Sequence, residues 1–309
     1  MGIVNIAVIG VGYLGKFHAQ KYQTLDGCNL VGLIDSSKQT LDEISSQFPE
    51  AETSTDYQSM LNYVDAVSIV TSTPSHYEIA KDFLAQGKHV LVEKPITSTT
   101  EQAQELISLA KNNNAILQVG HIERFNPTVL AMDEHLQHPK FIESERLAPF
   151  KARGTDVSVV LDLMIHDIDI ILSIVQSDIE SIQASGMCVL SEDIDIANAR
   201  ITFTNKCVAN VTASRVSNKS ERKLRLFQNN AYFSADLGNH SLKIYSRENN
   251  QITPKSFSFD KSDALLAETD HFITCINNNS QPLVTGEDGL RALNTAAQIT
   301  NTIQIHNTN

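Results

Sequence analysis

The first 35 residues hold the pattern that most restricts how this chain can fold. An almost uninterrupted apolar run at residues 3–10 leads directly into the loop sequence GVGYLG at 10–15. A helical stretch follows, and then a second apolar run, NLVGLID, at 29–35. Apolar runs of this kind are typical of strands covered on both faces. The order therefore predicts a strand, a glycine turn, a helix and a second strand.

Three glycines in this turn have the spacing of a dinucleotide-binding loop, and the second strand ends in an acidic residue. The first glycine permits a tight turn, the second lets a pyrophosphate approach the backbone, and the third lets the helix pack closely on the sheet. A carboxylate 20 residues further on can bind both ribose hydroxyls and repels a 2′-phosphate, so NAD is favoured over NADP. The predicted cofactor residues here are Gly10, Gly12, Tyr13, Leu14, Gly15 and Asp35. Two points stay open: Asp35 could simply cap the next helix, and Lys38 leaves NADP possible.

Strand and helix patterns alternate through the first 120 residues. Further strands are expected at 66–71, 89–94 and 115–120, and helices at 37–48, 76–86 and 99–114. This alternation predicts an α/β, doubly wound parallel sheet of the Rossmann type, the cofactor-binding domain of residues 1–120.

The pattern changes after residue 120 and predicts a second, α+β domain over 121–309. A helix near 126–136 and a charged, proline-containing loop precede a helix at 159–175 that is apolar almost all round. A β-meander follows, which predicts a mostly antiparallel open sheet. Its expected strands are 180–189, 196–204, 207–216, 221–228, 231–235 and 241–247, and closing helices are expected at 264–277 and 286–304.

Charge and cysteine content restrict the class of protein. The net charge of −12 argues against partners such as nucleic acid or an anionic membrane, because both need basic patches. No apolar run is long enough to cross a membrane, and no signal peptide precedes the first strand. Four scattered cysteines without a CxxC pair are typical of reduced thiols in a cytoplasmic protein.

Two further strand ends carry polar residues where a doubly wound sheet binds its ligand. The third strand is followed by VTSTPSH and the fourth ends in EKP. A solvated strand end would explain either one alone, but both together favour contact with the cofactor. The predicted contacts are Thr71, Thr73, Pro74, His76, Glu93 and Lys94. Pro95 fixes the turn after Lys94, and a cis bond there is possible.

The buried helix carries ionisable residues at Asp162, His166 and Asp169, spaced i, i+4, i+7 on one helical face. A single histidine there would more often be a core residue. Three ionisable groups each need a partner, and a His–Asp arrangement can orient an imidazole for proton transfer. His166 and Asp162 could bind a metal, but no third ligand is evident, so no metal site is predicted.

Taken in order, the glycine loop, TPSH, EKP and DxxxHxxD resemble the Gfo/Idh/MocA oxidoreductase family over nearly the whole chain. The resemblance implies hydride transfer between a nicotinamide and a carbon of a sugar or cyclitol. It implies Lys94 as the active-site lysine, His166 as the acid–base group and Asp162 as a hydrogen-bonding residue on the substrate side. Whether Lys94 or His166 is the base stays open. It also implies a homodimer or homotetramer formed through the second domain's sheet.

Two stretches, VGHIERFNP at 119–127 and RGTDVSVVLDLMIHDIDI at 153–170, are similar to the branch that oxidises nucleotide-activated amino sugars at C3, such as UDP-N-acetylglucosamine 3-dehydrogenases. The second stretch lacks the glycine-rich segment common in other members. Arg124 and Asn126 are the expected substrate contacts beside Asp162 and His166. The alternatives are a dehydrogenase of a free sugar or inositol, and a non-catalytic NAD-binding regulator.

Overall fold

The computed structural model describes residues 2–151, 157–248, 251–260 and 262–307. The chain forms two compact units, one of residues 1–122 and 263–290 and the other of residues 123–262 and 291–309. The first unit thus takes a late segment of the chain in addition to the expected first 120 residues. The assignment of cofactor binding to one domain and substrate binding to the other stays a prediction.

The first unit contains a six-stranded parallel sheet in the order β3-β2-β1-β4-β5-β6, which confirms the predicted doubly wound class. The strand order reverses direction between β1 and β4, and ligands of such sheets bind at that switch point. The short edge strand β3 was not predicted, because three residues carry too little pattern. The strands are β1 (Val4–Ile9), β2 (Cys28–Ile34), β3 (Glu52–Ser54), β4 (Ala66–Ile69), β5 (His89–Glu93) and β6 (Leu117–Gly120).

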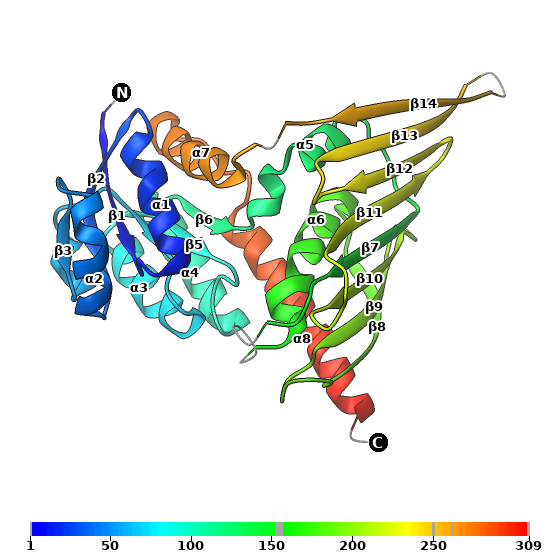
Figure 1. Ribbon diagram of the computed structural model, residues 1–309, viewed down its shortest axis with the longest axis horizontal. Coiled ribbons are helices and arrows are strands. Elements are labelled where there is room, and N and C mark those ends of the chain that lie inside the picture. The colour runs from blue at the N-terminus through cyan, green and yellow to red at the C-terminus, as the bar shows by residue number, and fades with distance from the viewer. Residues whose placement is uncertain (1, 152–156, 249–250, 261, 308–309) are drawn as a thin grey trace. The chain divides into compact units, whose positions relative to one another are not determined.

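Capping residues mark the ends of two helices of this unit. Thr99 and Gln102 form a reciprocal capping box at the start of α4, and Gly87, at φ +72°, follows the end of α3. The late helix α7 lies against α1 in the first unit (Figure 1). The helices are α1 (Tyr13–Thr24), α2 (Lys38–Ile44), α3 (Thr73–Ala85), α4 (Thr100–Asn112) and α7 (Ala264–Asn278).

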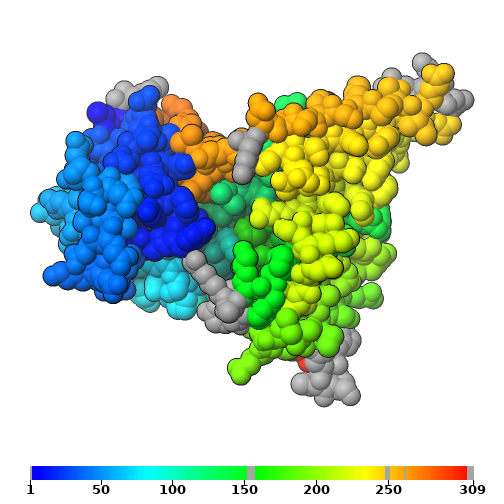
Figure 2. Space-filling model, in the orientation of Figure 1, coloured from blue at the N-terminus to red at the C-terminus, as the bar shows by residue number. Residues whose placement is uncertain are grey.

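The second unit contains an eight-stranded sheet in the order β14-β13-β12-β11-β7-β10-β9-β8. All neighbours are antiparallel except β7 and β10, so the predicted mostly antiparallel sheet is confirmed. Figure 2 shows β11 to β14 as a continuous surface in yellow to gold. The strands are β7 (Phe141–Leu147), β8 (Ile179–Met187), β9 (Ile196–Phe203), β10 (Val208–Ser214), β11 (Glu221–Gln228), β12 (Ala231–Asp236), β13 (Ser241–Glu248) and β14 (Gln251–Ser258).

Two of these strands were not predicted, and the expectation of a loop over residues 137–156 was wrong where β7 forms. β7 has the sequence FIESERL, in which Ile142, Ser144 and Arg146 are buried and the residues between them are half-buried. Its acidic residues suggested a loop, although the alternation by itself is that of a strand. β14 was missed because its side chains are almost all exposed and the segment contains Pro254.

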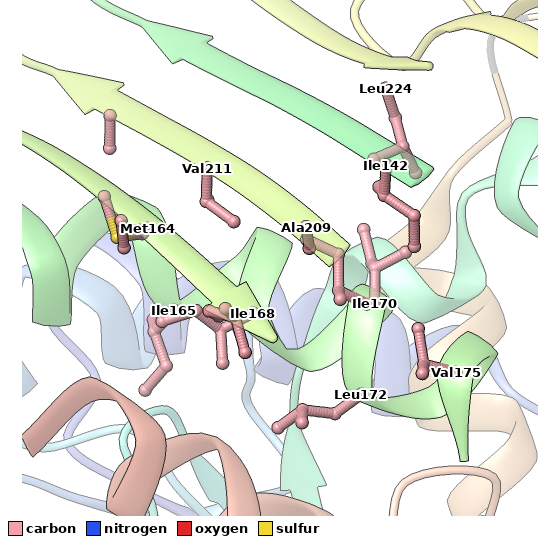
Figure 3. Packing of buried hydrophobic residues seen from close by; sticks show 14 of the residues in the cluster. Ile142, Met164, Ile165, Ile168, Ile170, Leu172, Val175, Ala209, Val211 and Leu224 are labelled. Atoms are coloured by element: carbon pink, nitrogen blue, oxygen red, sulfur yellow. The ribbon is translucent and has the colours of Figure 1, made fainter. Parts of the chain in front are cut away.

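Helices cover one face of this sheet, and among the described residues no helix lies on the other face (Figure 1). They are α5 (Pro127–Asp133), α6 (Ile165–Val175), preceded by a π-helical turn (Val160–Met164), and the part of α8 (Gly286–Asn307) that belongs to this unit. The predicted burial of the apolar helix is confirmed. Figure 3 shows α6 side chains such as Ile168 and Ile170 packed with the sheet residues Ile142, Ala209, Val211 and Leu224.

No helix in the described part of the chain is both long and apolar enough to cross a membrane.

Candidate functional site

The glycine turn of the first unit has the shape that a dinucleotide requires. Gly10 has φ +86°, and a Cβ there would lie 2.7 Å from the Val70 carbonyl oxygen. A Cβ on Gly15 would lie 1.8 Å from the Gly10 carbonyl oxygen, so the turn and α1 can close only with glycine at both positions. At Gly12 a Cβ would meet nothing within 4 Å. Gly12 therefore leaves open space in front of the first turn of α1, where its backbone N–H groups can receive a phosphate.

Asp35 lies at the end of β2 and is tied to the same turn. Its Oδ2 accepts a hydrogen bond from the Val11 N–H at 3.0 Å, and its Oδ1 accepts one from the Ser37 N–H at 2.9 Å. Ser37, not Asp35, is the N-cap of α2, because its hydroxyl accepts from the Thr40 N–H. The alternative that Asp35 caps the next helix is therefore wrong. Its carboxylate is held beside the glycine turn.

A cavity of about 610 Å³ opens beside these residues, within the size range of small-ligand sites. It lies at the carboxyl ends of β1, β2 and β4, and Gly10, Gly12, Asp35, Thr71 and Pro74 are among its lining residues. The structure thus brings five of the predicted cofactor residues together around one cavity.

The remaining predicted residues of this region lie differently. Tyr13 and Leu14 are exposed on the first turn of α1, and the Tyr13 ring packs edge-on against Phe17. Thr73 begins α3 and is half-buried. None of these three is among the lining residues of the cavity.

His76 connects two loops of the first unit. It is buried, and its ring nitrogens lie 3.0 Å from the Thr71 carbonyl oxygen and 2.9 Å from the Pro95 carbonyl oxygen. Burial lowers the pKa of His76 against the opposing effect of these carbonyls, so a neutral ring donates to one of them at a time. His76 therefore fixes the loop after β4 to the EKP turn.

The EKP turn at the end of β5 turns its glutamate inward. Glu93 is buried, its Oε1 lies 3.3 Å from His18 Nε2 on α1, and its Oε2 accepts from the Lys94 N–H at 3.2 Å. Burial by itself would raise the pKa of Glu93, but His18 and Lys94 outweigh it and the net shift is downward. Lys94 is half-buried, and the Lys94–Pro95 peptide bond is cis. Glu93 is thus an ionised, buried carboxylate next to Lys94.

Two residues near Glu93 were missed by sequence reasoning. His18 lies on α1, and its Nδ1 is 2.9 Å from Ser68 Oγ on β4. Glu268 lies on α7, and ligand atoms of His18, Glu93 and Glu268 all fall within 4.8 Å of one another. Among the described residues these are the one group of three or more His, Cys, Asp or Glu side chains this close. No local pattern could have indicated a cluster drawn from such distant parts of the chain.

In the second unit, the three ionisable residues of the predicted stripe differ in exposure. Asp162, in the π-helical turn, and His166, in the first turn of α6, are half-buried. Asp169 is buried, and its Oδ1 lies 3.5 Å from Nη1 of Arg124. Asp169 and Arg124 therefore form a buried ion pair, whereas Asp162 and His166 keep part of their surface accessible. π-Helical turns are frequent at functional sites.

A second buried acidic residue of α6, Asp167, was not predicted. Arg146 on β7 donates to both of its oxygens, from Nε at 2.7 Å and Nη2 at 3.2 Å. Arg146 Nη1 also donates to Glu123 at 2.9 Å, and Arg222 donates to the same Glu123 oxygen at 3.1 Å. Burial opposes ionisation of Glu123, yet both arginines lower its pKa. This network holds the first turn of α6 against the sheet.

Asn126 is buried at the start of α5 and is engaged within its own unit. Its side-chain nitrogen donates to Glu123 Oε2 and to the Leu237 carbonyl oxygen, both at 3.1 Å. Its side-chain oxygen accepts from the Thr128 N–H at 3.0 Å. These contacts make Asn126 the N-cap of α5, which is a structural role.

The stretch that carries the predicted branch resemblance, RGTDVSVVLDLMIHDIDI, begins at residue 153, and its residues 153–156 lie outside the described residues.

Comparison with protein families identifies both parts of the chain. Residues 4–121 match the oxidoreductase family model with an NAD-binding Rossmann fold, and residues 135–234 match the GFO/IDH/MocA C-terminal domain. The chain is also 35% identical over 308 residues to UDP-N-acetylglucosamine 3-dehydrogenase of Acidithiobacillus ferrooxidans, covering 96% of both chains. The chain belongs to the Gfo/Idh/MocA oxidoreductase family. Its cofactor is NAD, as the glycine turn and Asp35 predicted.

Other members of the Gfo/Idh/MocA family match at lower identity. The scyllo-inositol 2-dehydrogenase (NAD(+)) of Bacillus subtilis is 26% identical over 97% of this chain and 94% of its own. The solved structure of the Acidithiobacillus enzyme superposes with a TM-score of 0.93, covering 99% of both chains. A scyllo-inositol dehydrogenase from Lactobacillus casei, solved with bound NAD(H) and scyllo-inositol, has a TM-score of 0.84 at 21% identity over 98% and 97% of the two chains, and shows the same fold. The chain is a dehydrogenase that acts on CH–OH groups.

Proposed function

We propose that this protein oxidises the C3 hydroxyl of a nucleotide-activated amino sugar of the UDP-N-acetylglucosamine type, with NAD⁺ as hydride acceptor. The observation that carries the proposal is the difference in identity among full-length relatives. It is 35% to a UDP-N-acetylglucosamine 3-dehydrogenase and 26% to a scyllo-inositol dehydrogenase, over almost the same length.

The residues around the cavity of the first unit fit the cofactor. Gly12 and the first turn of α1 receive the pyrophosphate, and the Asp35 carboxylate accepts hydrogen bonds from the ribose hydroxyls. Thr71 and Pro74 follow the end of β4 and line the same cavity. His76 fixes the loop that carries Thr71, and Thr73 begins the helix after that loop. Tyr13 and Leu14 are exposed in the first turn of α1. NAD, when bound, supplies the acceptor for the hydride.

Side chains of the protein accept the proton of the C3 hydroxyl and stabilise the charge that develops on its oxygen. His166 accepts the proton of the C3 hydroxyl as the C–H hydride departs, and Lys94 stabilises the developing alkoxide with its ammonium group. In the alternative assignment Lys94 is the base, which requires that burial depress its pKa. Asp162 hydrogen-bonds the sugar beside His166. Arg124 contributes to the substrate side, and Asn126 acts there by holding the start of α5.

Single-turnover hydride transfer tests these roles. The variants His166→Asn and Lys94→Met remove the titrating groups while preserving approximate size. Each is expected to slow the hydride-transfer step by about 10²-fold or more, in line with the usual contribution of general acid–base groups. NADH affinity serves as the control for folding, and it should stay near the native value in His166→Asn. The catalytic assignment is wrong if neither variant slows the step.

A substrate panel separates the proposed reaction from its alternatives. NADH formation is measured with UDP-N-acetylglucosamine, free N-acetylglucosamine, and scyllo- and myo-inositol, each with and without 2-oxoglutarate as a hydride acceptor that can recycle retained NADH. Turnover of the UDP sugar alone supports the proposal. Turnover of an inositol would favour the second candidate, which the inositol dehydrogenase relatives suggest. NADH binding without any turnover would favour a non-catalytic regulator.

The open face of the second unit's sheet is the proposed contact between copies of the chain. Its outward side chains include a row of stacked rings, Phe227 on Tyr232 at 4.9 Å and Tyr232 on Tyr245 at 5.6 Å. Charged and polar residues such as Glu143, Arg200 and Arg225 line the rest of this face. We expect a homodimer or homotetramer, to be checked by sedimentation of the native protein and of Tyr232→Glu. The free cysteines Cys28, Cys188, Cys207 and Cys275 fit a reducing, cytoplasmic location.

A further inference from the structure

Glu268 is the most unusual titratable group in the first unit. It is fully buried on α7, and neither carboxyl oxygen makes a hydrogen bond to any described residue. No lysine or arginine of the described chain forms an ion pair with it. Gln118 on β6 donates to the backbone carbonyl oxygen of Glu268 at 3.2 Å, which holds the residue in place without helping its side chain. A buried carboxylate in such surroundings is costly unless it is neutral or balanced by a cation.

The groups that face Glu268 come from two elements. α1 presents His18 and the Tyr22 hydroxyl, and the end of β5 presents the Glu93 carboxylate, with Lys94 beyond it. Glu93 is already ionised and lies within 4.8 Å of the carboxyl group of Glu268. Burial, and after it the charge of Glu93, raise the pKa of Glu268 well above its ordinary value. If Glu268 were also ionised, its negative charge would lie within 4.8 Å of the Glu93 carboxylate and would be repelled by it, with the His18 imidazole nearby.

We propose that Glu268 is a neutral carboxylic acid in the working enzyme and that its proton is directed at Glu93, through one bridging water or after a small rotation of the side chain, so that Glu268 positions the strand end that carries Lys94. The hydrogen bond from Glu268 and the contact from His18 would hold Glu93 from two sides. The Ser68 hydroxyl oxygen lies 2.9 Å from Nδ1 of His18 and orients the imidazole so that its Nε2 faces Glu93. Nothing in the proposed sugar chemistry assigns a role to Glu268 itself, and the proposal concerns the position of Glu93 and Lys94, which are predicted cofactor contacts and can be tested with NADH in the absence of a sugar. Its outcome is therefore independent of which substrate the enzyme uses.

Infrared spectroscopy of the whole protein tests the proton directly. A protonated carboxyl group has a carbonyl stretch separated from the carboxylate bands, and the native protein at neutral pH should show one. Glu268→Gln should lose that band, which should therefore appear in the native-minus-variant difference spectrum. The exposed residue Glu50 provides the matched control, because Glu50→Gln should leave the band in place. Absence of the band in the native protein would overturn the proposal.

Two variants then distinguish the effect of the hydrogen bond that Glu268 donates from the effect of its lacking a charge. Glu268→Gln keeps a neutral donor of the same size, so its NADH dissociation constant should stay within about twofold of native. Glu268→Met is neutral and similar in length but cannot donate, so its NADH dissociation constant should rise about tenfold, the order expected for losing one hydrogen bond to a charged group. Equal NADH affinity in the Gln and Met variants, with both folded, would contradict a positioning role.

The pH dependence of stability tests the proton itself, because a change in packing alone would alter stability by the same amount at every pH. The folded protein retains the Glu268 proton above the pH, about 4.3, at which an unfolded glutamate loses it. The unfolding equilibrium of native protein should therefore shift toward the unfolded state by about tenfold per pH unit above that value, relative to Glu268→Gln, until the folded group ionises. Parallel profiles for the two proteins would overturn the proposal.

A bound cation is the competing explanation for the same three side chains. A His and two carboxylates are also ligands for Zn²⁺ or Mn²⁺. Elemental analysis of native protein purified without chelator should show less than stoichiometric metal, and chelation should change neither NADH affinity nor the infrared band. One equivalent of metal that is lost in Glu268→Gln would replace the proton with a metal ion and overturn the proposal.

Discussion

The two units each bury a cluster of acidic residues, and they neutralise it by different means. In the second unit, Glu123 and Asp167 share Arg146, which donates to both at 2.7 to 3.2 Å. In the first unit, Glu93 and Glu268 lie within 4.8 Å of each other and of His18, and no arginine of the described chain pairs with either. A guanidinium is always charged, so the carboxylates of the second unit are balanced by permanent cations. In the first unit burial and the charge of Glu93 raise the pKa of Glu268, so that carboxyl group is expected to stay neutral by keeping its proton.

The difference also reverses the effect of pH. The pKa of Glu123 lies below its ordinary value, because the two arginines outweigh burial. Its contribution to stability is therefore present above the unfolded pKa and is lost as the pH falls through the folded value. The pKa of Glu268 is raised, so its contribution is lost as the pH rises. The contributions of the two clusters to stability are therefore lost at opposite ends of the pH range.

The largest expected effect comes from breaking the arginine-paired cluster. Arg146→Met leaves Asp167 and Glu123 buried without their main partner. Removing one side of a buried ion pair typically costs about 3–5 kcal/mol, so the free energy of unfolding should fall by about that amount. Denaturant titration followed by circular dichroism measures it. A loss below about 1 kcal/mol would show that water reaches this cluster and that it is no anchor.

A smaller effect is expected from releasing the helix that carries Glu268. Asp263 caps α7 by accepting from the Leu266 N–H at 3.0 Å, and it pairs with Lys21 on α1 at 2.6 Å. Asp263→Ala removes a helix cap together with a partly exposed ion pair, which should cost about 1–2 kcal/mol in thermal or denaturant unfolding. Asp263→Asn keeps a capping oxygen and should recover most of that loss. Full recovery by Asn would assign the effect to the cap alone.

The acid dependence of the second unit gives a third test of the comparison. As the pH falls from about 6 to about 3, native protein should lose stability as Glu123 takes up its proton. Arg146→Met should lose less stability over the same interval, because Arg146 is the largest of the groups that lower the pKa of Glu123 and the variant keeps Arg222 beside it. Unfolding free energies at several pH values measure the slopes. Equal slopes for the native protein and Arg146→Met would show that protonation of Glu123 does not cause the loss of stability in acid.

The smallest effect is expected at an exposed pair on the same sheet. Arg225 and Glu143 lie 3.6 Å apart with 40% and 42% of their side chains exposed. Arg225→Met should change the free energy of unfolding by less than about 0.5 kcal/mol, because solvent and salt screen exposed pairs. It is the matched control for Arg146→Met: the same substitution, in the same sheet, at an exposed position. A comparable loss in both would show that burial is not what distinguishes them.

Local patterns in the sequence were sufficient for much of the first unit. The glycine turn, Asp35 and the polar strand ends were recognisable because the constraints act within a few residues of one another. The parallel sheet followed from alternation of strands and helices. Local charge also misled: the acidic residues of FIESERL concealed β7, which lies between β10 and β11. The buried positions of that strand depend on neighbours 67 to 86 residues away in the chain.

The sequence by itself therefore determined the cofactor turn, the order of most of the elements and the residues that the family resemblance assigns to catalysis. Only the tertiary structure decided which ionisable groups are buried and which partners they meet. It separated Asp169, paired with Arg124, from the more accessible Asp162 and His166, although all three share one helical spacing. It also brought Glu268 to Glu93 across 175 residues of chain. The physical reason is that the charge of a carboxyl group depends on desolvation and on nearby charges, and both are properties of the packed neighbours rather than of the local sequence.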